Sequence, residues 1–150
     1  MDFYSGRNRY IGYLSGIPVR SFENCKVALD CANGAAWMIA RAVFDALGAK
    51  TYVINDQPDG VNINTDCGST HIEGLQLYVR EHHLDVGFAF DGDADRCLAV
   101  DERGQVLNGD KITLYLKGEQ LEGRSIGGVQ RDHQPAGILV VQLAEVLQDQ

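Results

Sequence analysis

The sequence predicts an α/β fold: a single domain built as a three-layer α/β/α sandwich around a mostly parallel sheet. Three observations lead to this prediction. Short apolar runs typical of buried strands alternate with segments whose apolar residues recur at helical spacing. Turn-forming glycine and asparagine residues separate the two kinds of segment. Strands that alternate with helices are typical of a sheet covered by helices on both faces.

The first half of the chain contains one strand–helix–strand unit. The apolar run Lys26–Cys31 is followed by an Asn-Gly turn, which indicates a buried strand. A mostly covered helix is expected over Ala35–Leu47. Its apolar residues fall in two rows at four-residue spacing: Ile39, Val43 and Leu47, then Ala36, Ala40 and Phe44. Gly48 stands where a helix end favours a left-handed residue, and a second strand follows at Lys50–Ile54.

A long loop, Asn55–Ser69, leads into a second predicted helix. Thr70 and Glu73 have the spacing of a capping box, in which each side chain bonds the other residue's backbone amide. The helix is therefore expected to begin at Thr70 and to run to about His82.

Two further strands enclose an acidic loop. A buried strand is expected at Asp85–Phe90 and a fourth at Cys97–Val100. Gly104 then turns the chain toward a short apolar run, and the pair Asp110 and Lys111 is expected to begin a last helix rather than to form a site.

The composition narrows the possible partners and compartments. The net charge of −8 makes nucleic acid and anionic membranes poor partners, because the chain has no general positive field. No apolar run approaches the roughly 18 residues of a membrane span, and the N-terminus has no signal-peptide pattern. The cysteines form no Cys-x-x-Cys pair and are expected to be free thiols, which favours the cytoplasm: Cys25, Cys31, Cys67 and Cys97.

The loop after the third predicted strand carries the chemistry. Asp91, Asp93 and Asp95 alternate with the small residues Gly92 and Ala94, so the backbone can curl and bring three carboxylates together. Carboxylates so close repel one another unless a cation lies between them. A hard divalent cation with oxygen ligands, Mg²⁺ above all, fits this set. Ligands of open α/β sheets also bind beyond the carboxyl ends of strands.

Two other interpretations of this loop fit it less well. An EF-hand would place ligands at Asp91, Asp93, Asp95 and Glu102, but its sixth position requires glycine and is Arg96 here. The predicted flanks are also strands rather than helices. A solvated acidic turn is the second alternative, and it does not account for three aspartates spaced by Gly and Ala directly after a buried strand.

The loop Asp91–Arg96 resembles the metal-binding loop of the α-D-phosphohexomutases. Three further stretches, Asp30–Ala35, Pro58–Asn64 and Cys67–His71, resemble the phosphoglucosamine mutase branch of that family. The likeness covers about Arg9 to Asp110 and corresponds to the second of the family's four domains. It implies that residues 1–22 are a linker or helix from a preceding domain. It also implies that 23–118 form the metal-binding domain and that 119–150 form a tail of uncertain structure.

The resemblance also implies a reaction. In this family a phosphoserine on the first domain exchanges its phosphoryl group with a sugar phosphate, here glucosamine 6-phosphate and glucosamine 1-phosphate. The resemblance assigns Asp91, Asp93 and Asp95 as Mg²⁺ ligands and Arg96 as a residue that contacts phosphate. The alternative role of Arg96 is a structural ion pair with a neighbouring aspartate. No catalytic residue is expected on this chain, so the sugar phosphate would be bound together with the remaining domains, and the chain alone is expected to be inactive.

Other residues and other functions fit the sequence less well. Ser69 is better placed at a helix N-terminus than as the phosphoserine, and His71, His82 and His83 stand at helix ends. A phosphomannomutase or phosphoglucomutase fragment remains the alternative function, beside a stand-alone metal- or phosphate-binding module without turnover. A phosphatase of the haloacid-dehalogenase type fits less well, because Asp95 and Arg96 replace the apolar residue or threonine that should follow its second aspartate.

Overall fold

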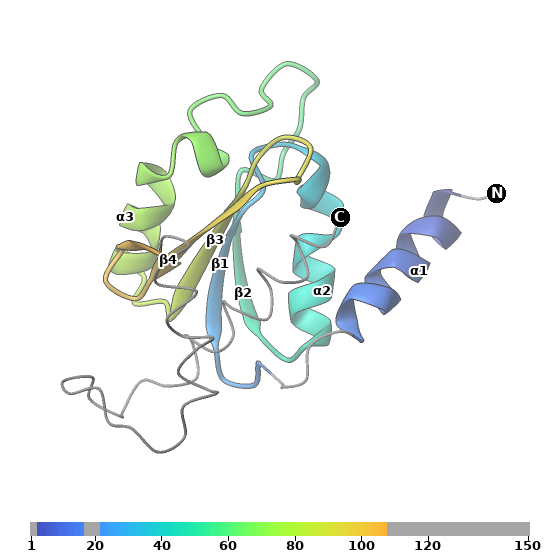
Figure 1. The fold of residues 1–150 in the computed structure, drawn as a ribbon, viewed down its shortest axis with the longest axis horizontal. Coiled ribbons are helices and arrows are strands. Elements are labelled where there is room, and N and C mark those ends of the chain that lie inside the picture. The colour runs from blue at the N-terminus through green and yellow to red at the C-terminus, as the bar shows by residue number, and fades with distance from the viewer. Residues whose placement is uncertain (1–2, 17–21, 108–150) are drawn as a thin grey trace, which may run out of the picture.

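A computed structural model describes residues 3–16 and 22–107 of the chain. Five strands form one sheet in the order β2-β1-β3-β4-β5 (Figure 1). Their bounds are Lys26–Asp30 for β1, Lys50–Ile54 for β2, Val86–Phe90 for β3, Cys97–Asp101 for β4 and Val106–Leu107 for β5. The first three strands are parallel, whereas β4 and β5 are antiparallel to their neighbours. The predicted α/β fold is confirmed. The sheet is mixed because a hairpin joins β3 and β4, which makes these two strands antiparallel.

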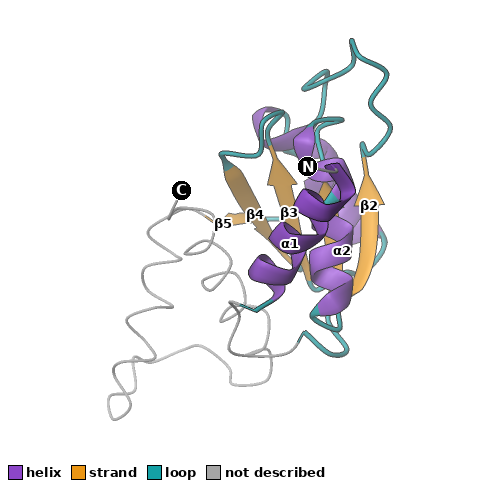
Figure 2. Ribbon diagram, turned by 90° about the vertical axis from the view of Figure 1, so that its right-hand side faces the viewer, coloured by secondary structure: helices purple, strands orange, loops and turns teal. Residues whose placement is uncertain are grey.

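Helices cover both faces of the sheet. Helix α3 (Glu73–Glu81) lies on one face and α2 (Ala40–Ala46) on the other, and α1 (Phe3–Ser15) packs beside α2 (Figures 1 and 2). The two outer layers and the sheet make the predicted three-layer sandwich. None of these helices is long and apolar enough to cross a membrane.

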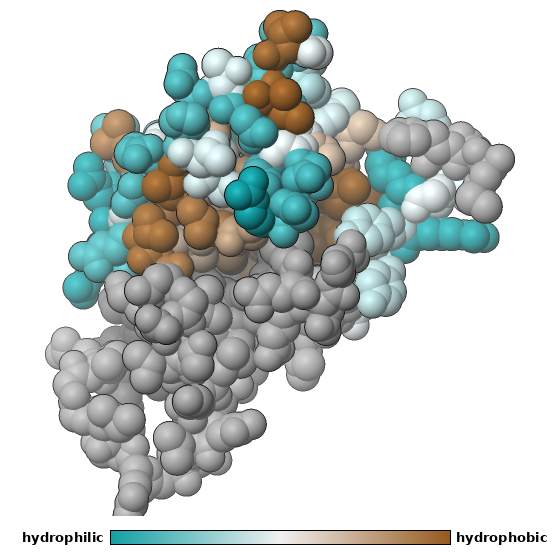
Figure 3. All heavy atoms as spheres, turned by 45° about the horizontal axis from the view of Figure 1, so that its top comes forward, coloured by the Kyte–Doolittle hydropathy of each residue, from teal (hydrophilic) through white to brown (hydrophobic). Residues whose placement is uncertain are grey.

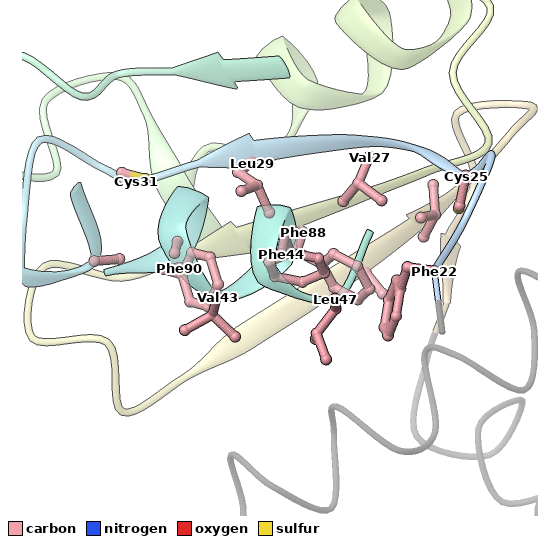
Figure 4. Packing of buried hydrophobic residues seen from close by; sticks show 14 of the residues in the cluster. Phe22, Cys25, Val27, Leu29, Cys31, Val43, Phe44, Leu47, Phe88 and Phe90 are labelled. Atoms are coloured by element: carbon pink, nitrogen blue, oxygen red, sulfur yellow. The ribbon is translucent and has the colours of Figure 1, made fainter. Parts of the chain in front are cut away.

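The α2 face of the sheet holds the larger part of the core. Alternate residues of β1 and β3 point to this face, as strand geometry requires. The ring of Phe44 on α2 packs between Phe22 and Phe88, with ring centroids 5.5 and 5.4 Å away (Figure 4). Around these rings lie buried residues from the strands, from α2 and from the residue that follows it: Val27, Leu29, Val43, Leu47, Val86 and Phe90.

The α3 face is packed with smaller strand residues. Ala28 and Ala89 face Leu75 and Val79 of the helix. Gly87 of β3 lies opposite Ala28, and a Cβ there would stand 2.7 Å from Cγ2 of Val79. The strands therefore let α3 approach closely, since no side chain at Gly87 keeps it away.

One predicted helix is divided in two, and the predicted start of another is wrong. The segment predicted as one helix over Ala35–Leu47 is a 3-10 helix, η1 (Ala35–Met38), followed by α2. Thr70 does not form the predicted capping box: its hydroxyl lies 3.5 Å from the Cys67 carbonyl oxygen, and α3 begins at Glu73 without a side-chain cap. Thr70 is held instead in a 3-10 turn, η2 (Gly68–Thr70), whose first amide is bound by the β1 carboxylate of Asp30.

Other local predictions are confirmed. Gly48 has φ +89° after α2, and Gly104 has φ +76° in the turn before β5. The four cysteines are free thiols. The helix predicted at Asp110 and Lys111, and the tail 119–150, lie outside the described residues.

Candidate metal centre

The acidic loop lies at the edge of the sheet where β1 and β3 end. Asp91 follows β3 and Arg96 precedes β4, and the strand residues beside them, Phe90 and Cys97, are paired. The Asp91 N–H donates to the Arg96 carbonyl oxygen over 3.3 Å, and the Ala94 N–H donates to the Asp91 carbonyl oxygen over 3.0 Å. The loop is thus a closed hairpin turn between two strands, which excludes an EF-hand, since that loop requires flanking helices.

The three aspartates converge as predicted. One carboxylate oxygen from each of Asp91, Asp93 and Asp95 can be chosen so that all three lie within 4.8 Å of one another. Asp91 is only 2% exposed, whereas Asp93 and Asp95 face solvent. In the part of the chain that the structure describes, this is the only such group of potential metal ligands.

Arg96 pairs with the buried aspartate. Its Nε lies 2.8 Å from Oδ2 of Asp91 and 3.5 Å from Oδ1 of Asp95, and its backbone N–H donates to Oδ1 of Asp91 over 3.2 Å. The Arg96 side chain is nevertheless 72% exposed. The ion pair that was the alternative role of Arg96 is therefore present, on a guanidinium that also faces solvent.

These contacts shift the pKa values of Asp91 and Asp95 in opposite directions. Burial raises the pKa of Asp91, but the hydrogen bonds from Arg96 outweigh burial and hold that pKa below its ordinary value. The pKa of Asp95 is raised, first by its hydrogen bond to Asp91, then by desolvation and by repulsion from the Asp91 and Asp93 carboxylates. The charged form of Asp91 is therefore favoured by Arg96, whereas the neighbouring carboxylates disfavour the charged form of Asp95, and a bound cation would offset that repulsion.

Two neighbouring loops pack closely against the acidic loop. The Ala35 N–H donates to the Gly92 carbonyl oxygen over 2.8 Å. A Cβ on Gly92 would stand 2.7 Å from both Nδ2 of Asn64 and Cδ1 of Ile63. The stretches 30–35 and 58–64 therefore both press on the middle of the acidic loop.

Asp30 is the residue of this edge whose role the sequence did not reveal. It is 1% exposed, at the end of β1. Its carboxylate accepts hydrogen bonds from the backbone N–H groups of Ala32 and Gly68 and from the Asn55 amide, over 2.9 to 3.0 Å. An aspartate that ends an apolar strand was a possible signal, because a buried carboxylate must find hydrogen-bond donors.

Unusual backbone conformations gather in the loops at this edge. Six of the non-glycine residues with positive φ lie there: Ala32, Asn33, Asn55, Asn64, Asp66 and Ala94. Such conformations cost free energy and persist only where the surroundings determine them, often at functional sites. Figure 3 shows hydrophilic side chains gathered on this side of the molecule, with apolar ones projecting beside them.

In the described part of the chain, no hydrogen bond or ion pair joins the serine and histidine candidates to the three aspartates. Ser69 is in the 3-10 turn η2. His71 has Nδ1 3.2 Å from the Thr70 hydroxyl, and His82 stacks on Tyr78 with ring centroids 4.1 Å apart. His83 adopts φ +51° just after α3. All three histidines are exposed.

Residues 8–104 match the family model of phosphoglucomutase/phosphomannomutase, α/β/α domain II. Two curated relatives, both named phosphoglucosamine mutase, are 64% identical to this chain over 124 residues. The match with the protein of Lachnospira eligens covers 83% of this chain and 27% of the relative. The match with that of Lachnoclostridium phytofermentans covers 83% and 28%. The chain thus spans about a quarter of the length of these relatives.

A solved structure shares the fold. The crystal structure of a phosphoglucomutase/phosphomannomutase family protein from Burkholderia thailandensis superimposes with a TM-score of 0.63 and 30% sequence identity. The match covers 76% of this chain and 25% of that protein. Both kinds of comparison therefore align this chain with one portion of a longer protein.

Proposed function

The chain belongs to the phosphoglucomutase/phosphomannomutase family, as its α/β/α domain II, and we propose from this premise that it is the metal-binding domain of a phosphoglucosamine mutase. In this proposal Asp91, Asp93 and Asp95 hold Mg²⁺, and Arg96 binds a phosphate oxygen beside it. The observation that carries the proposal is the convergence of the three carboxylates in a loop at the carboxyl end of the sheet.

The donor set fits a small hard cation. All three groups are carboxylates, which suit Mg²⁺, and together they leave coordination positions for water or a phosphate oxygen. Two oxygens bound to one Mg²⁺ at about 2.1 Å are at most about 4.2 Å apart. The oxygens here lie within 4.8 Å of one another, whereas adjacent ligands of an octahedral Mg²⁺ are about 3 Å apart, so rotations of the exposed Asp93 and Asp95 side chains would draw the set together.

The family's reaction gives each of these residues a task. A bound cation would offset negative charge on a transferring phosphoryl group. Asp91 anchors the set, because its burial and its bonds from Arg96 fix one carboxylate in place. Arg96 carries an exposed guanidinium, a group suited to binding phosphate oxygens in pairs.

The proposed substrates are glucosamine 6-phosphate and glucosamine 1-phosphate, interconverted through a phosphoserine that another domain would supply. The two relatives at 64% identity are named phosphoglucosamine mutase, which supports the amino sugar. The structure from Burkholderia thailandensis, at 30% identity, carries the wider family name. A phosphomannomutase or phosphoglucomutase domain is therefore the second candidate.

Titration calorimetry with Mn²⁺, and then with Mg²⁺, tests the metal assignment. The chain should bind weakly, since a phosphate oxygen is missing from its ligand set. Asp93→Asn should weaken binding further because it removes a charged ligand. Asp45→Asn is the matched control: Asp45 accepts a hydrogen bond from Thr51 at the other end of the sheet, so the same charge change there should leave the affinity unaltered. Equal affinities of Asp93→Asn and the unmodified chain would refute the assignment.

A further inference from the structure

Asp30 joins two loops that both reach the acidic loop: the turn after β1, through Ala32, and the long loop 55–69, through Asn55 and Gly68. Its carboxylate is buried at the end of β1, the strand next to β3 in the sheet. Oδ1 accepts from the Ala32 N–H and from Nδ2 of Asn55, each over 3.0 Å. Oδ2 accepts from the Gly68 N–H over 2.9 Å. Each of these three donors begins a short path of contacts that ends on the acidic loop.

The first path runs through Ala32. Its carbonyl oxygen accepts from the Asn64 N–H over 2.9 Å. The Asn64 side chain in turn lies against Gly92, where a Cβ would stand 2.7 Å from Nδ2 of Asn64. Ala32 has φ +51° and Asn64 has φ +58°, so both depend on their surroundings to hold these conformations.

The second path runs through Gly68. A Cβ on Gly68 would stand 2.4 Å from the Phe90 carbonyl oxygen and 2.5 Å from Cβ of Ala32. Gly68 therefore presses directly on the peptide unit that joins Phe90 to Asp91. Its own position is set by the bond to Asp30.

The third path runs through Asn55. Its carbonyl oxygen accepts from the Asn33 N–H over 2.7 Å. The next residue, Gly34, lies against Gly92, and the Ala35 N–H binds the Gly92 carbonyl oxygen. Contacts along three paths, from the turn after β1 and from the loop 55–69, thus converge on Phe90 and Gly92, which flank Asp91.

From these paths we infer that Asp30 is a positioning residue for the metal loop, acting on the ligands through Ala32, Asn55 and Gly68 without being a ligand itself. The inference rests on the proposed function, since it concerns how that site is shaped. A carboxylate is needed because three donors approach two oxygens, and an amide in its place would turn a donor toward one of them. Groups that orient metal ligands from behind typically change metal affinity when they are replaced.

The decisive variant is Asp30→Asn in the full chain, compared with Asp85→Asn. Asp85 also accepts a hydrogen bond from a backbone amide, the Lys26 N–H over 2.7 Å, but at the opposite end of β1. Both variants remove one negative charge from a carboxylate that accepts a backbone N–H, but only Asp30 accepts three donors with its two oxygens. Asp30→Asn should weaken Mn²⁺ binding by the folded protein about tenfold, whereas Asp85→Asn should lower thermal stability and leave the affinity unchanged.

A second variant separates positioning from simple charge. Asn55→Gly removes one donor to Asp30 without changing the net charge, and glycine accepts the φ of +53° found at this position. Like Asp30→Asn, it should weaken Mn²⁺ binding, but by a smaller factor. If Asp30→Asn does not fold, Asn55→Gly by itself tests the inference.

Amide NMR spectra without metal provide the independent readout. Asp30→Asn or Asn55→Gly should shift the signals of residues 91–96 more than Asp85→Asn does. Shifts confined to the loops that bond Asp30, with an unchanged Mn²⁺ affinity, would overturn the inference. If the unmodified chain binds no Mn²⁺ at all, the proposed function fails, and the amide shifts still decide whether Asp30 controls the acidic loop.

Discussion

Gly34 and Gly92, which are far apart in the sequence, are in direct backbone contact. A Cβ on Gly34 would stand 2.3 Å from the Gly92 carbonyl oxygen and 2.6 Å from the Gly92 Cα. The turn after β1 therefore packs on the acidic loop with no room for a side chain between them. The φ of Gly34 is −114°, a value open to any residue, so contact rather than conformation requires glycine here.

Replacing Gly34 with alanine should therefore destabilise the protein and disturb the metal loop together. A neighbour made of backbone cannot rotate away, so we expect a loss of about 1–3 kcal/mol, as for other overpacked sites. The displaced Gly92 should also weaken Mn²⁺ binding. Urea unfolding and calorimetric titration measure the two effects.

Gly74→Ala is the matched control for that variant. Gly74 lies in α3, and a Cβ there would meet nothing within 4 Å. The substitution should stabilise the helix by about 0.5–1 kcal/mol and leave Mn²⁺ affinity unchanged. If the Gly34→Ala protein is as stable as the unmodified chain, the turn after β1 and the acidic loop can move apart without loss of stability.

Arg96 should weaken the binding of the cation and strengthen the binding of phosphate. Its Nε lies 2.8 Å from Oδ2 of Asp91, where it competes for an oxygen that the proposed cation needs. Arg96→Gln should therefore tighten Mn²⁺ binding severalfold and weaken the binding of inorganic phosphate to the Mn²⁺-loaded chain. Arg103→Gln makes the same charge change beside Glu102, in the turn between β4 and β5, and should alter neither. Weaker Mn²⁺ binding by Arg96→Gln would mean that Arg96 mainly orients Asp91.

The main parts of the site could be predicted because their signals are local. The strand Val86–Phe90 and the spacing of the three aspartates are both visible within a dozen residues, and both hold in the structure. The convergence of carboxylates needs only a tight turn after a strand. Their role as metal ligands stays a proposal.

What supports the site could not be predicted, because it depends on contacts between distant segments. The bonds from Asp30 to Asn55 and Gly68 span 25 and 38 residues. The capping box at Thr70 failed for the same reason. Thr70 and Glu73 have the right spacing, but the hydrogen bond from the Gly68 N–H to Asp30 holds residues 68–70 in a 3-10 turn, and α3 begins only at Glu73.

The buried thiols should make stability fall at high pH. Desolvation, then the nearby Asp30 and Asp56 carboxylates, raise the pKa of Cys31 to about 12, and burial raises that of Cys25 to about 11. In the unfolded chain these thiols ionise near their ordinary pKa of 9.0. Between these values the unfolded state binds fewer protons than the folded state, so stability is lost as pH rises from about 9 toward about 12.

Cys31→Ala isolates one thiol from this effect. Cys31 is 0% exposed, so its ionisation opposes folding by up to about 1.4 kcal/mol per pH unit in that range. The variant should lose stability with pH more gradually than the unmodified chain, although it is less stable near neutral pH. Urea unfolding under reducing conditions at several pH values provides the slopes. Parallel slopes for the two proteins would show that the Cys31 thiolate is tolerated in the fold.

The chain by itself should not interconvert glucosamine 6-phosphate and glucosamine 1-phosphate. The proposed reaction needs a phosphorylated serine to give and retake the phosphoryl group, and Ser69, the serine considered for this role, lies in the 3-10 turn η2. The reaction also needs groups that orient the sugar and its distal phosphate, and such orientation can supply up to about 7–11 kcal/mol of the barrier. The acidic loop and Arg96 alone do not provide it.

The assay follows glucosamine 1-phosphate formed from glucosamine 6-phosphate with Mg²⁺ and catalytic sugar bisphosphate. Asp91→Asn is the informative companion, since Asp91 is the buried member of the triplet. Turnover by the pure chain that disappears in Asp91→Asn would show that a nucleophile lies within these 150 residues. Turnover that appears only when the remaining domains of a phosphoglucosamine mutase are added, and that again requires Asp91, would show that the metal loop serves an active site assembled from several domains.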